Sequence, residues 1–430
     1  MNGGEDVYKT EEVIEKEALH AEIKADSPQT AQSMSDADQR APMSRPVTLL
    51  FAAACGMSVA NIYFAQPLLD QLSSEFGIDH SIVGIVITIT QIFYGLGLLL
   101  LVPLGDFLNQ RRLIIGQMLL STIALGIVGT STTSSILFAG MALVGLLAVV
   151  TQTLVAFAAT MAAPAERGRV VGMVTSGIVI GILLARSISG ILTDLAGWRS
   201  VYLVSAALML LMICMFLRVL PHVEREVHSL SYPKLLGSVL MLFIQERTLR
   251  IRSILALLIF ADFSILWTSL VLPLSGPPLS LTHSAIGAFG LAGVAGALAA
   301  ARAGKLADLG YGQRTTGIAL MLLLVSWLFI SRIEQSLLAL VIGIVLLDLA
   351  VQAVHVTNQT MILPLRMDAR SRITAGYMVF YSIGSAGGSI ASTHTYAHYG
   401  WEGVCLLGAS VSTAALLFWT MTRRTTAARH

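Results

Sequence analysis

The chain has 430 residues, of which 55% are hydrophobic and only 12% are charged, and its formal net charge is +2. Its mean hydropathy is +0.77, which excludes an ordinary soluble domain. A net charge this small gives no electrostatic reason to expect a nucleic-acid partner. We expect a protein that is embedded in a lipid bilayer.

Residues 1–45 are polar and acidic, with no apolar run that would make a signal peptide or a membrane span. We predict a disordered cytoplasmic tail there. Twelve apolar stretches follow, each of about 20 residues and long enough to cross a bilayer as a helix. Their predicted bounds are 47–69, 82–103, 113–131, 135–162, 169–194, 199–220, 252–274, 284–304, 315–333, 336–364, 373–397 and 401–422.

The longest polar connection between these stretches, 221–250, divides them six and six. We predict an N-terminal six-helix half at 46–220, a central cytoplasmic loop at 221–250 and a C-terminal six-helix half at 251–425. The predicted fold class is an all-α membrane protein with twelve transmembrane helices in two pseudo-symmetric halves.

An internal repeat supports this division. The polar break Pro103–Arg112, PLGDFLNQRR, recurs as Gly304–Arg314, GKLADLGYGQR. Three landmarks share one offset of 202 or 203 residues: Asp106 with Asp308, Arg169 with Arg372, and Trp198 with Trp401. A common offset indicates two homologous halves, and carriers whose halves rock about a central site are built in this way.

Lysine and arginine are distributed unevenly among the loops. Only Arg199 and Arg332 fall on one side of the predicted membrane, and the ratio between the two sides is roughly ten to one. Because cytoplasmic loops accumulate these residues, we expect both termini and the central loop in the cytoplasm, and the chain in an inner or plasma membrane.

The repeated break lies between spans 2 and 3 and again between spans 8 and 9. With twelve spans and a long central loop, this arrangement resembles the major facilitator superfamily over about residues 45–425; the family's motif in these loops is G-x-L-A-D-r-x-G-r-k. The second copy matches the motif at Gly304, Leu306, Ala307 and Asp308 but has Tyr311 where glycine is usual. The first copy keeps its acid and arginines but has Val102 and Asn109 in place of both glycines.

The resemblance implies that the charged residues of the two breaks form a conformational latch: Asp106, Arg111, Arg112, Asp308 and Arg314. A charge cluster worth about 1–3 kcal/mol at a partly buried interface would bias a carrier between two conformations. The alternative is that these are ordinary loop charges.

Span 5 has a second family signature in altered form. Proton-coupled drug antiporters of the superfamily carry G-x8-G-x3-G-P-x2-G-G there, and this chain has, in register, Gly172, Gly181, Ala185, Arg186, Ser189 and Gly190. The small residues predict close helix packing. Arg186 replaces the proline, which weakens the implication of antiport. A cation inside a span is a functional candidate by default, so we predict that Arg186 lines the substrate cavity; a structural ion pair or a side chain that snorkels outward is the alternative.

Span 10 has a polar stripe spaced i, i+4, i+7 and i+11, which places its members on one helical face: Asp348, Gln352, His355 and Gln359. We predict that Asp348 and His355 take part in proton coupling and that Gln352 lines the cavity, unless the stripe is only a helix interface. Asp262 in span 7 is a third proton-coupling candidate, and Arg186 is one hypothetical partner for it.

The remaining substrate-cavity candidates are polar or aromatic residues of spans 1, 2, 4 and 7: Asn61, Gln66, Gln91, Gln152 and Trp267. Each of the polar ones alternatively bonds a neighbouring helix.

The sequence has no nucleotide-cradling G-x-x-x-x-G-K-[ST] motif and no Cys/His ligand cluster, so we predict no cofactor, no metal and no enzymatic activity. We expect a monomeric secondary active transporter that exports small amphiphilic or sugar-like molecules in exchange for protons. Its expected partners are the small-molecule substrate, protons and the lipid bilayer. Two alternatives stay open: a uniporter or proton symporter that imports a small nutrient, for which Arg186 would suit an anion, and a non-transporting receptor built on a carrier fold.

Overall fold

The computed structural model describes residues 43–106, 108–163, 166–220, 232–293, 302–366 and 369–426. The predicted tail lies outside these residues except for 43–45. The first group of helices is α2 (Arg45–Tyr63), η1 (Gln66–Leu68), α3 (Leu69–Phe76), α4 (Ile85–Leu100), η2 (Val102–Asp106), α5 (Gln110–Gly129), α6 (Ser134–Leu147), α7 (Val150–Met161), α8 (Arg167–Ala196) and α9 (Trp198–Val219). The second group is α10 (Tyr232–Gln245), α11 (Arg247–Ser269), α12 (Val271–Ser275), α13 (His283–Ala288), η3 (Phe289–Gly293), η4 (Ala307–Tyr311), α15 (Gly312–Ile330), α16 (Leu337–Ile362) and α17 (Arg370–Thr426).

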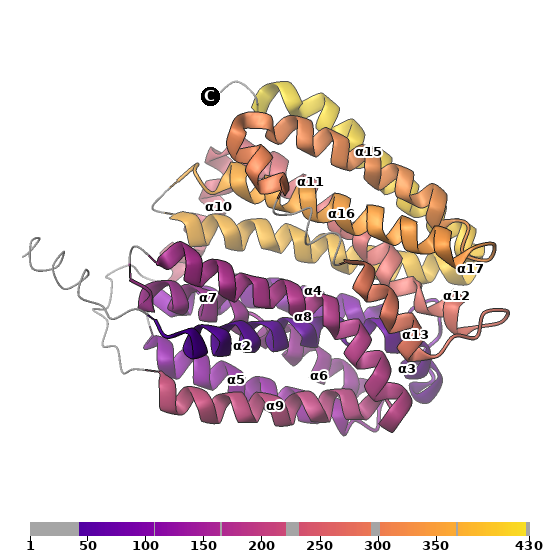
Figure 1. Ribbon diagram of the computed structural model, residues 1–430, viewed down its shortest axis with the longest axis horizontal. Coiled ribbons are helices and arrows are strands. Elements are labelled where there is room, and N and C mark those ends of the chain that lie inside the picture. Colours follow the sequence, from indigo (N-terminus) through magenta and orange to yellow (C-terminus); the bar gives the residue numbers. More distant parts are fainter. Residues whose placement is uncertain are drawn as a thin grey trace, which may run out of the picture.

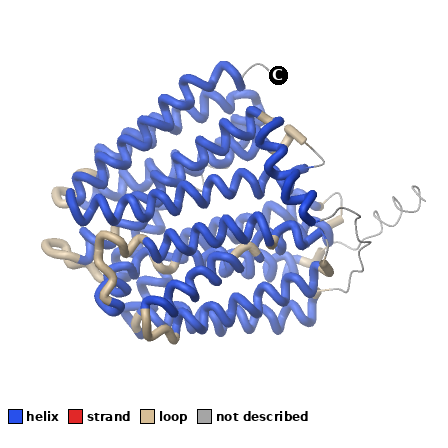
Figure 2. The backbone as a smooth tube through the Cα atoms, turned by 180° about the vertical axis from the view of Figure 1, so that it is seen from behind, coloured by secondary structure: helices blue, strands red, loops and turns tan. Residues whose placement is uncertain are grey.

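The long helices lie side by side and gather into two groups, α2 to α9 in indigo to magenta and α10 to α17 in salmon to yellow (Figure 1). No strand occurs in the part of the chain that the structure describes (Figure 2). Ten helical segments among the described residues are long and apolar enough to cross a membrane. The predicted all-helical, membrane-spanning fold is therefore confirmed.

The last of these segments, Arg372–Arg423, covers two predicted spans, which meet at Gly400. The eighth predicted span, 284–304, begins as α13 and η3, but its residues 294–301 lie outside the described ranges. The count of twelve spans is thus consistent with the structure without being fully visible in it.

The internal repeat reappears in the backbone. Gly197 and Gly400 both adopt a positive φ, 77° and 62°, and each directly precedes a tryptophan that begins the next span. Glycine is the residue that takes this left-handed conformation without steric cost, so both halves make the same turn with the same residue pair.

The predicted central loop differs from the structure, because its residues 232–245 form helix α10 and α11 already begins at Arg247. Val239 and Leu242 are buried, and Phe243 stacks on Phe380 of α17 at a centroid distance of 5.2 Å. The charges around this segment made it resemble a loop, whereas its apolar face packs on α17.

We call the end of the bundle that contains Arg45 and Arg247 the inner end, and the end that contains Gly77 and Gly197 the outer end. Helices α3, α12 and α13 lie at the outer end, on the right in Figure 1. These names follow the lysine and arginine distribution.

The two groups of helices meet closely toward the outer end. A Cβ atom added to Gly84, the residue just before α4, would lie 2.4 Å from the carbonyl oxygen of Ser389 on α17, and Thr88 Oγ1 of α4 donates to the Ala386 carbonyl at 2.9 Å. Deeper in, the hydroxyls of Tyr63 and Tyr381 form a hydrogen bond between the groups. These contacts hold the outer end together.

Candidate substrate site

Arg186 of α8 is the centre of a cluster to which both groups of helices contribute. Its side chain is 2% exposed, and its Nε donates to Gln66 Oε1 at 2.8 Å. The guanidinium carbon lies 3.8 Å from the ring centroid of Trp267, 5.3 Å from that of Phe263 and 5.4 Å from that of Tyr63. Such cation–π contacts stabilise a desolvated cation. Arg186 is therefore held inside the bundle and does not snorkel outward.

Asp348 of α16 contacts the same tryptophan, Trp267, at the edge of its ring. Trp267 Nε1 donates to Asp348 Oδ1 at 3.1 Å, and Asp348 is 5% exposed. The same indole therefore contacts the guanidinium with its face and the carboxylate with its N–H group. Among the described residues, no ion pair within 4.0 Å joins Arg186 to Asp348.

Small residues of span 5 fix the position of α8. A Cβ atom on Gly181 would lie 2.2 Å from the carbonyl oxygen of Gly56 on α2, and one on Gly287 of α13 would lie 2.4 Å from the carbonyl oxygen of Arg186 itself. Ser187 Oγ also donates to the Gly287 carbonyl at 2.9 Å. The backbone at Arg186 is thus packed between helices of both groups, which determines where the guanidinium points.

A small cavity of about 10 Å³, which is room for about one water molecule, adjoins Arg186. Apart from Gln66, Trp267 and Arg186, its lining is apolar and consists of Pro67, Leu270, Val271 and Ile286. Gln66, Arg186, Trp267 and Asp348, which the sequence assigned to one cavity and its proton path, are thus brought together by the structure.

Asp262 lies elsewhere. This unexposed carboxylate of α11 accepts from Trp327 Nε1 at 3.1 Å through one oxygen and from the Ser412 hydroxyl through the other. Both donors belong to helices of the second group, α15 and α17. The hypothetical pair of Asp262 with Arg186 is therefore not formed.

The second half of the span 10 stripe, His355 and Gln359, belongs to a polar network. His355 Nδ1 lies 3.0 Å from the Tyr377 hydroxyl, and Gln359 Nε2 lies 3.3 Å from His355 Nε2. Gln352 is half-buried between Asp348 and His355. The stripe therefore has two parts. Asp348 contacts Trp267, whereas His355 lies at the interface between α16 and α17.

Arg252 was missed as an interior residue. It is 1% exposed, and its Nη1 donates to Thr316 Oγ1 and to Asn358 Oδ1, each at 3.1 Å. Its place at the edge of predicted span 7 made it one of the inner loop charges, but α11 begins earlier, at Arg247, so Arg252 lies more than a turn inside the helix.

The other predicted cavity residues have separate surroundings. Asn61 Oδ1 accepts from Ser205 Oγ at 2.7 Å, which is a contact within the first group of helices. Gln91 is 2% exposed, and its Oε1 has no hydrogen-bond partner in the described part of the chain.

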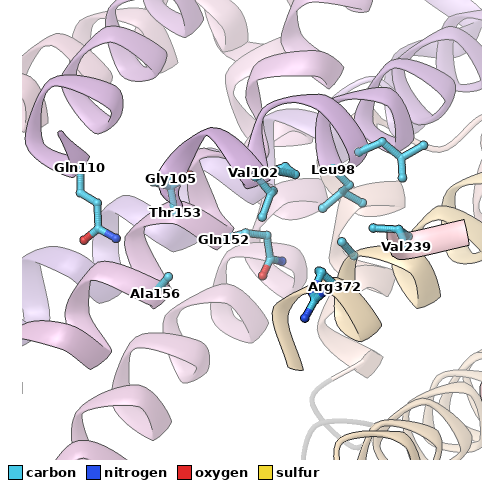
Figure 3. Close-up of a pocket in the computed structure, with 12 residues that line it drawn as sticks. Leu98, Val102, Gly105, Gln110, Gln152, Thr153, Ala156, Val239 and Arg372 are labelled. Atoms are coloured by element: carbon cyan, nitrogen blue, oxygen red, sulfur yellow. The ribbon is translucent and has the colours of Figure 1, made fainter. Parts of the chain in front are cut away.

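Gln152 lines a different and larger pocket, of about 70 Å³, near the inner end. Figure 3 shows Gln152 of α7 next to Arg372 of α17, with Leu98 and Val102 of the first group and Val239 of α10 around them. Arg372, a landmark of the sequence repeat, donates from Nη1 to Ser238 Oγ at 3.0 Å. This inner pocket is therefore lined by both groups of helices.

The side chains of Asp106 and Asp308 lie outside the described part of the structure, so the predicted latch stays a prediction. Arg111 Nη2 donates to the Leu217 carbonyl of α9 at 2.7 Å, and the Arg314 guanidinium lies 5.6 Å from the Tyr311 ring centroid. Arg112 lies in the first turn of α5, where its N–H donates to Asn109 Oδ1 at 3.3 Å. Asn109, which replaces a motif glycine, thus caps that helix.

A second cluster between the two groups lies at the outer end and was not predicted. His283 Nε2 of α13 lies 3.2 Å from both carboxylate oxygens of Asp70 on α3, and its Nδ1 lies 3.3 Å from Asp194 Oδ1 on α8. Asp194 also accepts from the backbone N–H groups of His283 and Ser284, at 3.2 and 2.8 Å. The hydrogen bond that His283 donates to Asp70 and the charges of both aspartates raise the pKa of His283 against the opposing effect of partial burial. The only sequence signal was an acid at the outer end of spans 1 and 5 and a histidine before span 8.

Membrane-spanning helices in two groups, with a buried polar cluster between them, define a membrane transporter. The family model described as "Major Facilitator Superfamily" matches residues 48–247 and 252–430, and this chain belongs to that superfamily. The resemblance inferred from the loop motifs is therefore confirmed.

Several relatives are named as transporters. The chain is 48% identical over 377 residues to the "Uncharacterized transporter YgaY" of Escherichia coli O157:H7, covering 88% of this chain and 95% of that protein. It is 27% identical over 417 residues to the "Multidrug resistance protein MdtG" of Salmonella paratyphi A, covering 91% and 98%. It is 26% identical to the "Inner membrane transport protein YnfM" of Escherichia coli K12 over 266 residues, covering 62% and 64%.

Among solved structures, a bacterial homologue of the human lysosomal transporter Spinster, in an inward-facing and occupied conformation, superposes with a TM-score of 0.72 at 14% identity. The match covers 89% of this chain and 98% of that one. At this identity, the likeness concerns the fold alone.

Proposed function

We propose that this transporter is a proton-coupled secondary carrier that works by alternating access, with its substrate site between an N-terminal half at 46–220 and a C-terminal half at 251–425. The observation that carries the proposal is the cluster of Arg186, Trp267 and Asp348. It joins a cation of one group of helices to a carboxylate of the other through one indole ring. A charge inside a membrane protein is retained where function needs it.

The contacts at the two ends of the bundle support a carrier closed at its outer end. There, His283 links to Asp70 and Asp194, and Gly84 packs directly on the backbone of α17. The larger pocket between the groups lies near the inner end. In the proposed cycle, the outer contacts break when the halves rock, while the loop charges at Asp106 and Asp308 act as the inner latch.

Asp348 is our preferred proton-coupling group. It contacts Trp267, which also stacks on Arg186, so a proton on its carboxylate changes the charge balance at the interface of the halves. His355 lies on the same helix and is the second candidate. Asp262 ranks below both, because its two donors, Trp327 and Ser412, belong to its own half.

For the direction of transport, we propose export of small amphiphilic or sugar-like molecules in exchange for protons. The small-residue register of span 5 and the relative named for multidrug resistance support this choice. A second candidate is a uniporter or a proton symporter that imports a small nutrient. It is favoured by Arg186, whose Nη2 has no hydrogen-bond partner among the described residues.

We propose a location in the bacterial inner membrane as a monomer, with both termini in the cytoplasm. The distribution of lysine and arginine supports the orientation. The relative named as an inner membrane transport protein supports the location.

The test is the internal pH of proteoliposomes that contain the purified full-length protein, recorded while sugars, amino acids, organic acids and lipophilic cations are added singly. Proton movement against the direction of the solute supports export by exchange, and movement with the solute supports the second candidate. Solute flux without any proton movement would refute proton coupling. Absence of flux for every solute in the panel would argue against a carrier.

A further inference from the structure

A third cavity lies in the second group of helices and is larger than either cavity described above. It has a volume of about 600 Å³ and is open along one side. The end of predicted span 8, helix α15 and helix α16 line it, and we call it the lateral groove. Its lining includes Arg302, Leu306, Arg314, Ile318, Leu322 and Leu349.

The lateral groove opens toward the lipid side of the bundle. Apolar residues of α15 that are 39% to 68% exposed recur at spacings of three and four: Ile318, Met321, Val325 and Leu328. Residues at these spacings share one face of a helix, and an exposed apolar face of this length on a membrane-spanning helix is covered by lipid. Because Ile318 also lines the groove, acyl chains of the bilayer have access to it.

Two arginines lie at the inner end of the groove. Arg314 is in the first turn of α15 and directly precedes predicted span 9, so it lies at the depth of the lipid headgroups. Arg302 lies shortly before η4, and both side chains are exposed. Within the described ranges, neither arginine forms an ion pair within 4.0 Å, and no acidic side chain lines the groove. Two positive charges are therefore available to an anion from the membrane.

Apolar residues continue the groove from these arginines toward the middle of the membrane. Leu322 comes eight residues after Arg314, which corresponds to about 12 Å along an α-helix. Leu349 and Ala353 of α16 line the same groove. A soluble anion would leave this apolar part unoccupied, whereas a glycerophospholipid has a phosphate at one end and acyl chains at the other.

We propose that the lateral groove binds an anionic glycerophospholipid of the inner leaflet, with the phosphate at Arg302 and Arg314 and one acyl chain between α15 and α16. A zwitterionic lipid has the same phosphate and chains, but its ammonium group cancels the attraction of the two arginines. The groove therefore selects lipids by the charge of the headgroup. This site shares no lining residue with the cavity at Arg186, and it goes beyond the proposed function, because it depends neither on the direction of transport nor on proton coupling.

The test is native mass spectrometry of the purified full-length protein in detergent, titrated with phosphatidylglycerol or with phosphatidylethanolamine that carries the same palmitoyl and oleoyl chains. Phosphatidylglycerol is expected to bind about 30-fold more tightly, because each arginine at a membrane surface favours an anionic lipid about fivefold. Equal affinities of the two lipids would overturn the inference. Excess glycerophosphoglycerol, the headgroup without chains, is expected to leave the lipid bound; displacement would instead indicate a site for soluble phosphodiesters.

Variants of the two arginines locate the site. Arg302→Gln and Arg314→Gln are each expected to weaken the binding of phosphatidylglycerol about fivefold, and the double variant about 30-fold, to the level of phosphatidylethanolamine. Because both side chains are exposed, we expect these variants to fold. Arg218→Gln is the matched control, since Arg218 is an exposed arginine at the inner end of α9 that does not line the groove. Unchanged lipid binding in the double variant, or an equal loss in Arg218→Gln, would refute the proposed site.

Discussion

Replacing His283 by glutamine is expected to loosen the outer end of the carrier and to remove a pH dependence from its closure. The imidazole contacts Asp70 and Asp194, which belong to the other group of helices, and the three side chains are 14%, 20% and 29% exposed. For partly exposed ion pairs of this kind, we assign about 0.5–1 kcal/mol to each contact. The loss of both, about 1–2 kcal/mol, corresponds to a shift of about 5- to 30-fold toward the outer-open state.

The sign of the pH dependence follows from the raised pKa of His283, which is caused first by its hydrogen bond to Asp70. Closure binds a proton, because His283 has the raised pKa only when it contacts the two aspartates. The contribution to closure is therefore complete below the ordinary histidine pKa of about 6.5, and it is lost as the pH rises through the raised value. Arg186 is the other charged residue of α8 near α13, and it faces the central cluster.

The assay is the distance distribution between spin labels at Leu195→Cys and Tyr399→Cys, two outer positions that are 77% and 74% exposed, with Cys55, Cys214 and Cys405 replaced by alanine. The wild-type background is expected to open as the pH is raised, whereas His283→Gln should be more open and much less sensitive to pH. His80→Gln is the control, because His80 Nδ1 contacts Ser73 of its own group at 3.3 Å. Identical pH responses of His283→Gln and the wild-type background would refute the reasoning.

Three further substitutions test the packing of α8 and the ranking of the buried acids. Gly181→Ala should lower the free energy of unfolding by about 1–3 kcal/mol, because the new Cβ would lie 2.2 Å from the Gly56 carbonyl oxygen. Gly172→Ala on the same helix meets nothing within 4 Å and should be neutral or slightly stabilising; thermal unfolding that ranks the two variants the other way would contradict the packing. Asp262→Asn should keep proton-coupled flux in proteoliposomes, since Trp327 and Ser412 already satisfy this carboxylate within one half. Loss of coupling in a folded Asp262→Asn protein would show that the ranking of the acids is wrong.

Much of the fold was predictable because its signals are local or periodic. Apolar stretches of membrane length set the helices, and the common offset of Trp198 and Trp401 revealed the two halves, where the structure has the same glycine turn twice. The segment 232–245 was harder to predict, because the charges on either side of it resemble those of a loop, and its apolar face becomes evident only against α17.

The site was predictable in its residue types but not in its pairings. Arg186, Asp348 and Trp267 were each identifiable as polar or aromatic residues inside apolar spans. Nothing in one sequence indicates which acid lies nearest to a cation of another span. Asp262 was therefore a possible partner for Arg186 until its bonds to Trp327 and Ser412 were known.

The outer cluster and Arg252 were missed for a related reason. His283, Asp70 and Asp194 come from three separate span ends, and each resembles an ordinary loop residue by itself. In the sequence, Arg252 looks like the neighbouring arginines at the inner end. It differs from them because helices distant in sequence bury its side chain.

The central claim is that a proton on Asp348 is coupled to transport between the halves. The most direct measurement compares wild-type protein with Asp348→Asn in proteoliposomes, where internal pH and the uptake of a solute transported by the wild type are recorded together. The account predicts that solute drives proton movement in the wild type and that the variant, inserted normally, moves no protons with the solute. Proton movement in Asp348→Asn equal to that of the wild type would contradict the account.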